Sequence, residues 1–405
     1  MEALSDKLLM LFLLLFMIIA FLSGFNPKRI LSPLNLMFFS SFIFFTPLFV
    51  ITTVDTPYIL RTGTSILILS VLILFLISDR IKYPEGQIKQ YYFVNQHWFI
   101  AILFLLLSVS LFLQYEDVLK AMEADNGVFS WKALRIFKAY LIKTTRIGDY
   151  IFYMIILLNS FYLLFGSSSK LKWVFGMLTL LDVVLSSGRT FLLLFLIPYL
   201  LMTINFKRMI IIVTLFVSAF GIIHVLRFRP QDNQTMINSL VSYTALPIIA
   251  FDSISESSDP VWDFKHTLRL ADKIKIKITG QGSAAELVHA DIQIGKYVGN
   301  VYTFFFPYYF DGGYLYILAA VAILALLANT VYVRMGNDSF LKLFYVIIVY
   351  IILMFWFQDS AVSLLSAHLQ YLAIFLLCRF FFLRNVKPVP LSKPVDTQNH
   401  EGNSV

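Results

Sequence analysis

The chain has few of the residues that soluble enzymes use for chemistry and solvation. Its 405 residues include a single cysteine, Cys378, which excludes an intrachain disulfide and a cysteine metal cluster. Only 14% of the residues are charged, whereas a soluble domain carries about 25%. This scarcity of charge excludes an ordinary soluble globular protein.

Familiar catalytic signatures are missing as well. The sequence has no HExxH, CxxC, paired-aspartate metal motif, GxSxG or phosphate-binding glycine loop, so neither a metal nor a cofactor is expected. No pair of segments repeats in register, as the halves of many transporters do. Much of the net charge of +8 lies at the ends of apolar runs rather than in a basic patch, so nucleic acid is not an expected partner.

What the chain has in abundance is long apolar runs. Hydrophobic residues make up 59% of the chain, and they gather in runs of about 18 residues or more, long enough to cross a bilayer as helices. The pattern predicts an all-α polytopic membrane protein. Its transmembrane helices, about 11 in number, are expected at 8–24, 30–51, 59–78, 97–113, 148–165, 171–187, 190–204, 209–226, 314–333, 340–357 and 361–383.

Basic residues recur in alternate connections between these runs, which the positive-inside rule assigns to the cytoplasm. They are Lys28, Arg29, Arg80, Lys82, Lys89, Lys170, Lys172, Lys207, Arg208, Arg334, Lys342, Arg379, Arg384, Lys387 and Lys393. The N-terminus then faces outside and the C-terminus inside. We expect a membrane region at 1–226, a large outer loop at 227–313, a second membrane region at 314–383 and a disordered cytoplasmic tail at 384–405.

The outer segment 114–147 has a basic, amphipathic pattern. At about 100° per residue, its basic side chains fall within an arc of roughly 140°, opposite apolar ones. A helix of this kind lies on the membrane surface and meets phosphate groups. The basic residues are Lys132, Arg135, Lys138, Lys143 and Arg146.

Arginines near the outer ends of the runs predict an anion site. The guanidinium fork binds phosphate oxygens in a bidentate way, and Arg189 also adjoins the free N-terminus of the helix expected from Thr190. Asp182, Asp359 and His368 are expected at the same depth, which indicates a polar cavity open to the outer face. The candidate anion ligands are Arg135, Arg146, Arg189, Arg227, Arg229 and Arg269.

The stretch 227–313 also carries the candidates for a general base. Such a base needs a histidine or carboxylate within hydrogen-bond reach of the reacting hydroxyl, and the candidates are His266, Glu286, His289, Asp291 and Asp311. Glu286 and His289 are three positions apart, which places them on one face of a helix. The alternation from Lys273 to Ile278 predicts a half-buried strand or a surface-lying segment.

Two short motifs in this chain resemble those of a known family. The turn Asn300-Val301-Tyr302-Thr303, followed by Tyr308, Asp311-Gly312-Gly313 and an apolar run, resembles the oligosaccharide repeat unit polymerases (Wzy, O-antigen polymerases). So does Ser187-Gly188-Arg189-Thr190, and the overall architecture is similar along essentially the whole chain. The resemblance implies a GT-C-like membrane fold with two larger periplasmic loops, in the bacterial inner membrane.

The family's activity is then the expected function. The resemblance implies metal-independent, inverting glycosyl transfer between undecaprenyl-diphosphate-linked oligosaccharides in O-antigen, lipopolysaccharide or related surface polysaccharide biosynthesis. It implies a diphosphate site that includes Asn300, Tyr302 and Thr303 with the arginines, and partners that are the Wzx flippase, the Wzz chain-length regulator and membrane lipids. An O-antigen ligase, a lipid-linked oligosaccharide flippase or transporter, and a non-catalytic scaffold stay open as alternatives.

Overall fold

The computed structural model describes residues 12, 15, 19, 29, 31–50, 60–84, 88–123, 127–128, 130, 133–134, 147–186, 189–202, 214, 236–285, 292–294, 297–299, 303–358, 360–361 and 364–385. This part of the chain is mostly helical, as the sequence predicts. The helices are α2 (Pro33–Val50), α3 (Thr62–Arg80), α4 (Gln96–Glu123), α6 (Ile147–Phe165), α7 (Ser169–Leu185), α8 (Arg189–Met202), α10 (Met236–Ser257), α11 (Arg269–Thr279), α12 (Phe305–Arg334), α13 (Leu341–Met354) and α14 (Leu365–Phe382). The short strands are β1 (Tyr91–Phe93), β2 (Ile292–Ile294), β3 (Tyr297–Gly299) and β4 (Leu383–Asn385).

Among these residues, four helices are long and apolar enough to cross a membrane, namely α3, α4, α12 and α14. Helix α3 has 19 residues, which at about 1.5 Å per residue gives about 28 Å, close to the roughly 30 Å of a bilayer's hydrocarbon core. Shorter apolar helices accompany them. The coarse prediction of a helical membrane protein agrees with this, while the total of about eleven spans stays a prediction.

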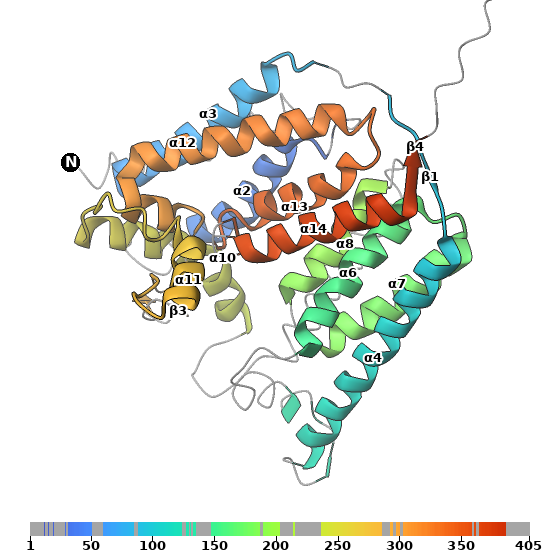
Figure 1. Ribbon diagram of the computed structural model, residues 1–405. Helices are drawn as coiled ribbons and strands as arrows, with labels where there is room; N and C mark the ends of the chain where they lie inside the picture. The colour runs from blue at the N-terminus through green and yellow to red at the C-terminus, as the bar shows by residue number, and fades with distance from the viewer. Residues whose placement is uncertain are drawn as a thin grey trace, which may run out of the picture.

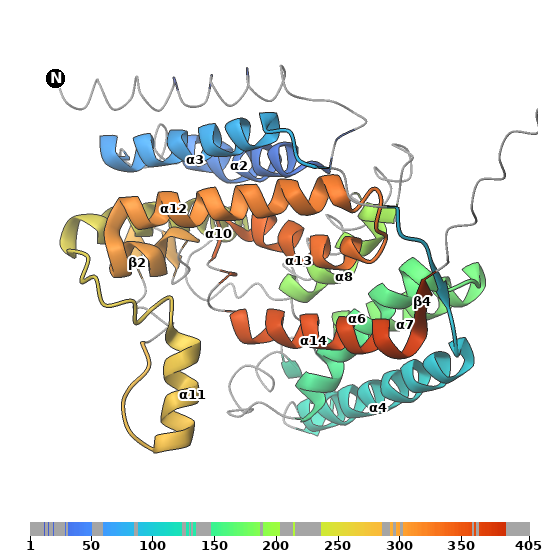
Figure 2. The same ribbon diagram turned by 45° about the horizontal axis from the view of Figure 1, so that its top comes forward.

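The helices form two groups that share one apolar core. In the first group, α12 packs along α3, and α10 and α13 pack on α2; in the second, α4, α6 and α7 pack on one another (Figure 1). Helices α13 and α14 join the groups through α8 and α6 (Figure 2). One continuous set of buried apolar side chains runs through both groups.

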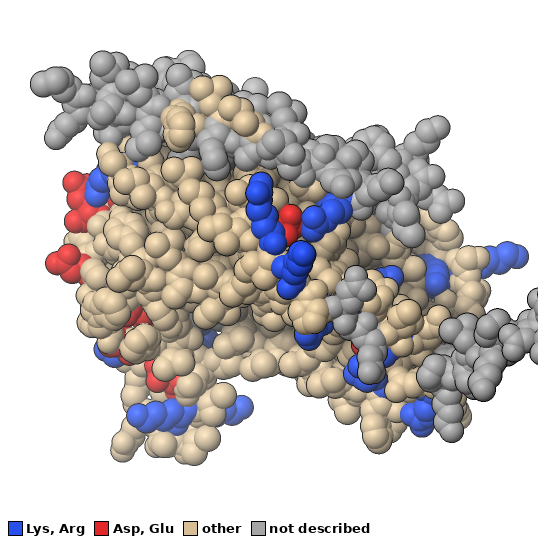
Figure 3. Space-filling model, turned by 90° about the horizontal axis from the view of Figure 1, so that it is seen from above, with Lys and Arg blue, Asp and Glu red and all other residues tan. Residues whose placement is uncertain are grey.

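Segments with the expected cytoplasmic lysines and arginines meet at one end of the molecule. Strand β1 pairs antiparallel with β4, Lys89 forms an ion pair with Asp338 at 3.7 Å, and Ser167 Oγ donates to Gln96 Oε1 at 2.9 Å. Viewed from above, basic side chains predominate at this end, whereas acidic ones gather at the end where α12 begins, together with a second group of basic ones (Figure 3). The clustering fits the predicted alternation of loops, and which end faces the cytoplasm stays a prediction.

The predicted loop 227–313 contains a core helix. In α10, Ala245, Ile248 and Phe251 have no exposed surface and belong to the apolar core. Its Asp252 is also fully buried, accepting hydrogen bonds from the backbone N–H of Arg61, at 3.3 Å, and from the hydroxyl of Thr64. Asp252 therefore anchors α10 to the first turn of α3. Pro247 and the polar residues after Phe251 interrupt the apolar run, so the sequence pattern did not predict this helix.

The strand predicted for Lys273–Ile278 is wrong, because this stretch lies within helix α11. The helix ends at Gly280, whose φ of 69° gives the left-handed cap that glycine adopts easily. The other prediction for this stretch, a surface-lying segment, agrees with a helix that has no buried residue.

Candidate functional site

A break inside α12 positions the carboxylate of Asp311. Two glycines after Asp311 leave the helical conformation, and Gly313 has φ 66° and ψ −160°, a region that is essentially restricted to glycine. The turns before the break are fixed by stacked rings, since Phe304 lies on Phe355 with a centroid distance of 4.5 Å. Asp311 therefore ends a short, rigid segment at the acidic end of the molecule.

The carboxylate of Asp311 is fully buried and is saturated with hydrogen bonds. Its Oδ1 accepts from the backbone N–H of His266 at 3.0 Å and lies 3.0 Å from His266 Nδ1. Its Oδ2 accepts from the backbone N–H and the hydroxyl of Thr267, each at 2.6 Å. Four donors match the lone pairs of an ionised carboxylate. Asp311 thus ties the turn before α11 to the break in α12.

The same contacts orient the imidazole of His266. Its ring stacks on Phe310 with a centroid distance of 5.2 Å, and 25% of its side chain is exposed. With Nδ1–H donating to Asp311, the neutral ring carries its lone pair on Nε2. A histidine held by a carboxylate through one nitrogen can take a proton at the other, as a general base does.

The three residues before His266 form part of the wall of a cavity. Asp263 accepts from Lys265 Nζ at 2.6 Å, and this hydrogen bond lowers the pKa of the Asp263 carboxyl. Phe264 packs its ring edge against Tyr316 at 5.5 Å. The cavity has a volume of about 300 Å³. It is lined by Asp263, Phe264, Lys265, Leu268, Asp272, Lys275, Ile276, Gln281, Gly282 and Ser283.

Asp263, His266 and Asp311 together could also hold a metal ion. The ligand atoms of Asp263, His266 and Asp311 lie within 4.8 Å of one another. However, the carboxylate of Asp311 already has four donors, and Lys265 places its ammonium group on Asp263. A metal would have to displace Lys265 and the proton on His266 Nδ1, so the donor set fits a hydrogen-bonded pair better than a metal centre.

The structure brings together two of the five predicted general-base candidates, His266 and Asp311. Arg269, a predicted anion ligand, lies three positions beyond His266, and its Nε donates to the carbonyl oxygen of Ala285 at 2.6 Å. Thr303 is fully buried and its hydroxyl accepts from the N–H of Phe305 at 3.3 Å, so it stabilises the start of α12.

The other predicted residues are not part of this group. Arg189 begins α8. Asp182 is fully enclosed and accepts hydrogen bonds from Ser110 at 2.8 and 3.0 Å, rather than lining an open cavity. His368 Nε2 lies 2.7 Å from the carbonyl oxygen of Ser360. Outside the described residues lie Arg135, Arg146, Arg227, Arg229, Glu286, His289, Asp291, Asn300, Tyr302 and Asp359.

Sequence reasoning missed Asp263 and Thr267. Both are within three positions of His266, in Asp263-Phe264-Lys265-His266-Thr267. This density of polar side chains directly before an amphipathic helix is the signal that could have identified the turn. Comparison with protein-family models, with curated proteins and with solved structures found no match, so the site rests on its own geometry.

Proposed function

We propose that this protein is a membrane glycosyltransferase that joins undecaprenyl-diphosphate-linked oligosaccharide repeat units at the periplasmic face of the bacterial inner membrane. His266 acts as the general base, and Asp311 orients it. The observation that carries the proposal is the 3.0 Å contact between His266 Nδ1 and Asp311 Oδ1 beside an open cavity.

The proposed reaction needs one proton acceptor and one site for a leaving anion. The acceptor hydroxyl oxygen bonds to the anomeric carbon of the donor as the bond from that carbon to the diphosphate oxygen breaks. The hydroxyl proton passes to His266 Nε2, and the bonding electrons leave with the diphosphate. The nearby Arg269 is a candidate to neutralise the developing charge, because its guanidinium keeps N–H groups beyond the Nε bond to Ala285.

The surroundings suit a substrate with a lipid tail. The pair lies near the N-terminal end of α12, one of the helices apolar enough to cross a membrane. A polyprenyl chain can stay among exposed apolar side chains of such helices while its diphosphate and sugars reach the polar turn. The carboxylates of Asp263 and Asp272 and the amide of Gln281 in the cavity wall suit hydrogen bonding to sugar hydroxyls.

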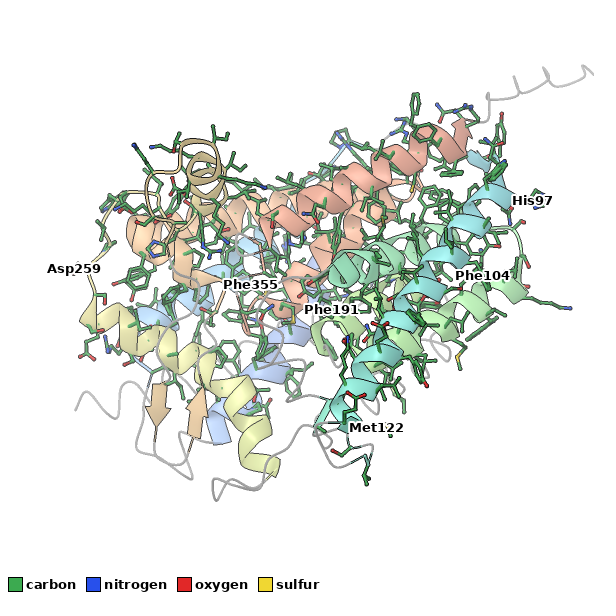
Figure 4. The ribbon with its side chains drawn as sticks, turned by 60° about the horizontal axis from the view of Figure 1, so that its bottom comes forward. His97, Phe104, Met122, Phe191, Asp259 and Phe355 are labelled. Carbon is green, nitrogen blue, oxygen red and sulfur yellow. The ribbon has the colours of Figure 1, made fainter. Side chains whose placement is uncertain are left out.

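The test is the length of the surface polysaccharide in cells whose own gene is replaced by variants. His266→Ala should abolish long chains, since a general base contributes about 10²- to 10⁴-fold. His97→Ala is the matched control, because His97 is exposed on α4, far from the turn after α10 that Asp259 marks (Figure 4). The two proteins are compared at equal membrane levels. Unchanged chain lengths in His266→Ala cells would contradict the proposal.

The number of repeat units that remain on the lipid A core in His266→Ala cells distinguishes a polymerase from a ligase. A polymerase defect leaves one repeat unit on the lipid A core, whereas a ligase defect leaves the core without any repeat unit. We expect the single repeat unit.

A further inference from the structure

Helix α11 presents an apolar stripe that is half-buried at its first residue and exposed at the next two. Leu270, Ile274 and Ile278 follow one another at intervals of four residues and so share one face. Ile274 is 52% exposed and Ile278 is 78% exposed, and no residue of the helix is buried. Exposed isoleucines at such spacing mark an interaction surface.

The opposite face of α11 is the one that contacts the protein. Asp272 and Ile276 line the cavity together with Gln281 and Gly282 from the returning chain. Arg269, at the start of the helix, holds the returning segment through the carbonyl oxygen of Ala285. The apolar stripe therefore points away from the body of the protein, and its occupant must come from outside this part of the chain.

The charges beside the stripe identify the occupant as an anionic surface. Lys273, Lys275 and Lys277 are exposed, and Lys275 also borders the cavity, as does Asp272, the acidic residue of the helix. At about 100° per residue, Lys277 and then Lys273 lie on one side of the stripe, and Lys275 lies on the other side, toward the cavity. Lysine stems can lie along an apolar surface while their ammonium groups reach lipid phosphates.

The position of the helix favours the bilayer itself. The axis of α11 crosses the direction shared by α12 and α14, near the end where α12 begins (Figures 1 and 2). If α12 spans the membrane, α11 runs along its surface. Trp262, which is 60% exposed, and Leu268 precede the helix, and tryptophan is enriched at the boundary between lipid and water.

We propose that α11 is an interfacial helix that docks on the anionic lipid surface of the membrane in which the protein sits. Docking fixes the turn before α11 at the level of the lipid headgroups. His266 lies three positions before Arg269, so the same docking sets the depth of its imidazole. This inference requires a membrane location and does not depend on glycosyl transfer.

The test uses spin labels on the full chain in lipid nanodiscs that contain phosphatidylglycerol. Single cysteines replace Ile274, Ile278 or Lys273 in a Cys378→Ser background. Labels at 274 and 278 should be at least about threefold more accessible to oxygen, and less accessible to a water-soluble nickel chelate, than the label at 273. Thermal unfolding confirms that each variant is folded.

Two results would overturn the proposal. Equal nickel accessibility at 278 and 273 would mean that the stripe faces water, and exclusion of both reagents at 274 and 278 would mean that protein covers it. Nanodiscs of phosphatidylcholine alone test the charge requirement. In these nanodiscs the difference in nickel accessibility between the labels at 278 and 273 should be smaller. An undiminished difference would contradict the role of anionic lipid.

Discussion

The Nδ1 atom of His266 lies 3.0 Å from Oδ1 of Asp311, although 45 positions separate the two residues. This contact joins the turn before α11 to the break in α12, and the carboxylate completes it by accepting both backbone N–H groups of His266 and Thr267. The carboxylate of Asp311 thus stabilises the conformation of the turn and orients the imidazole of His266. Substitutions of Asp311 and of a second buried carboxylate, Asp338, separate these two roles.

Replacing Asp311 with Asn should affect both stability and transfer. The amide group has one oxygen in place of two, so buried donors on one side lose their acceptor, at a cost of about 1–3 kcal/mol. The imidazole also loses the anion that orients it. We expect a lower melting temperature in detergent and a transfer rate, per folded molecule, that falls by about tenfold or more.

Asp338→Asn is the matched control for this change. Asp338 is a buried carboxylate at the opposite end, where it accepts from the N–H of Phe340 at 2.9 Å and from the hydroxyl of Tyr91 at 3.3 Å. This variant should also lose stability but should keep its transfer rate per folded molecule. Equal rates in both variants would leave Asp311 as a purely structural residue.

Gly313→Ala should destabilise the break in α12. The φ of 66° and ψ of −160° are accessible to glycine and cost another residue about 1–3 kcal/mol, and the added Cβ would lie 3.4 Å from Pro260 Cγ. Thermal unfolding measures the effect.

Gly63→Ala provides the comparison for the glycine variant. Gly63 is the second residue of α3, where the new Cβ would meet Tyr314 at an ordinary 3.6 Å. Because alanine is favoured over glycine by up to about 1 kcal/mol in a helix interior, and by less in a first turn, this variant should be neutral or slightly stabilised. A Gly313→Ala protein as stable as Gly63→Ala would show that the break tolerates a side chain.

The predicted topology gives opposite labelling at the two ends of the molecule. In a Cys378→Ser background, Asp259→Cys should react with a membrane-impermeant thiol reagent in intact cells. His97→Cys should react only after the cells are permeabilised, since both positions are exposed but lie at opposite ends (Figure 4). Protection of Asp259→Cys in intact cells would mean that the protein has the opposite orientation and that the proposed site does not face the periplasm.

The apolar runs predicted several helices closely. The run at 59–78 corresponds to α3 at Thr62–Arg80, and the run at 97–113 begins with α4, which continues to Glu123. The continuation was missed because hydropathy falls after Gln114 while the helix persists. For Lys273–Ile278, isoleucines at intervals of two also stand four apart at Ile274 and Ile278, so the pattern fits a strand and a helix equally.

The candidate site was predictable residue by residue but not as a group. His266 and Asp311 each qualified because ionisable groups are scarce in this chain and both fall in its polar stretch. Their contact depends on the conformation of Gly312 and Gly313 and on the segment after α10, where the N–H of Val261 donates to the carbonyl oxygen of Phe310 at 2.8 Å. Neither feature produces a hydrophobic periodicity in the sequence, so the contact between His266 and Asp311 could be identified only from the structure.

The most direct test of the account is glycosyl transfer by the purified protein in lipid nanodiscs, with an undecaprenyl-diphosphate-linked oligosaccharide as both donor and acceptor. Wild-type protein and His97→Ala should extend the oligosaccharide at the same rate, and His266→Ala should be slower by about 100-fold or more. A rate for His266→Ala equal to that of His97→Ala would contradict the assignment of His266 as the general base.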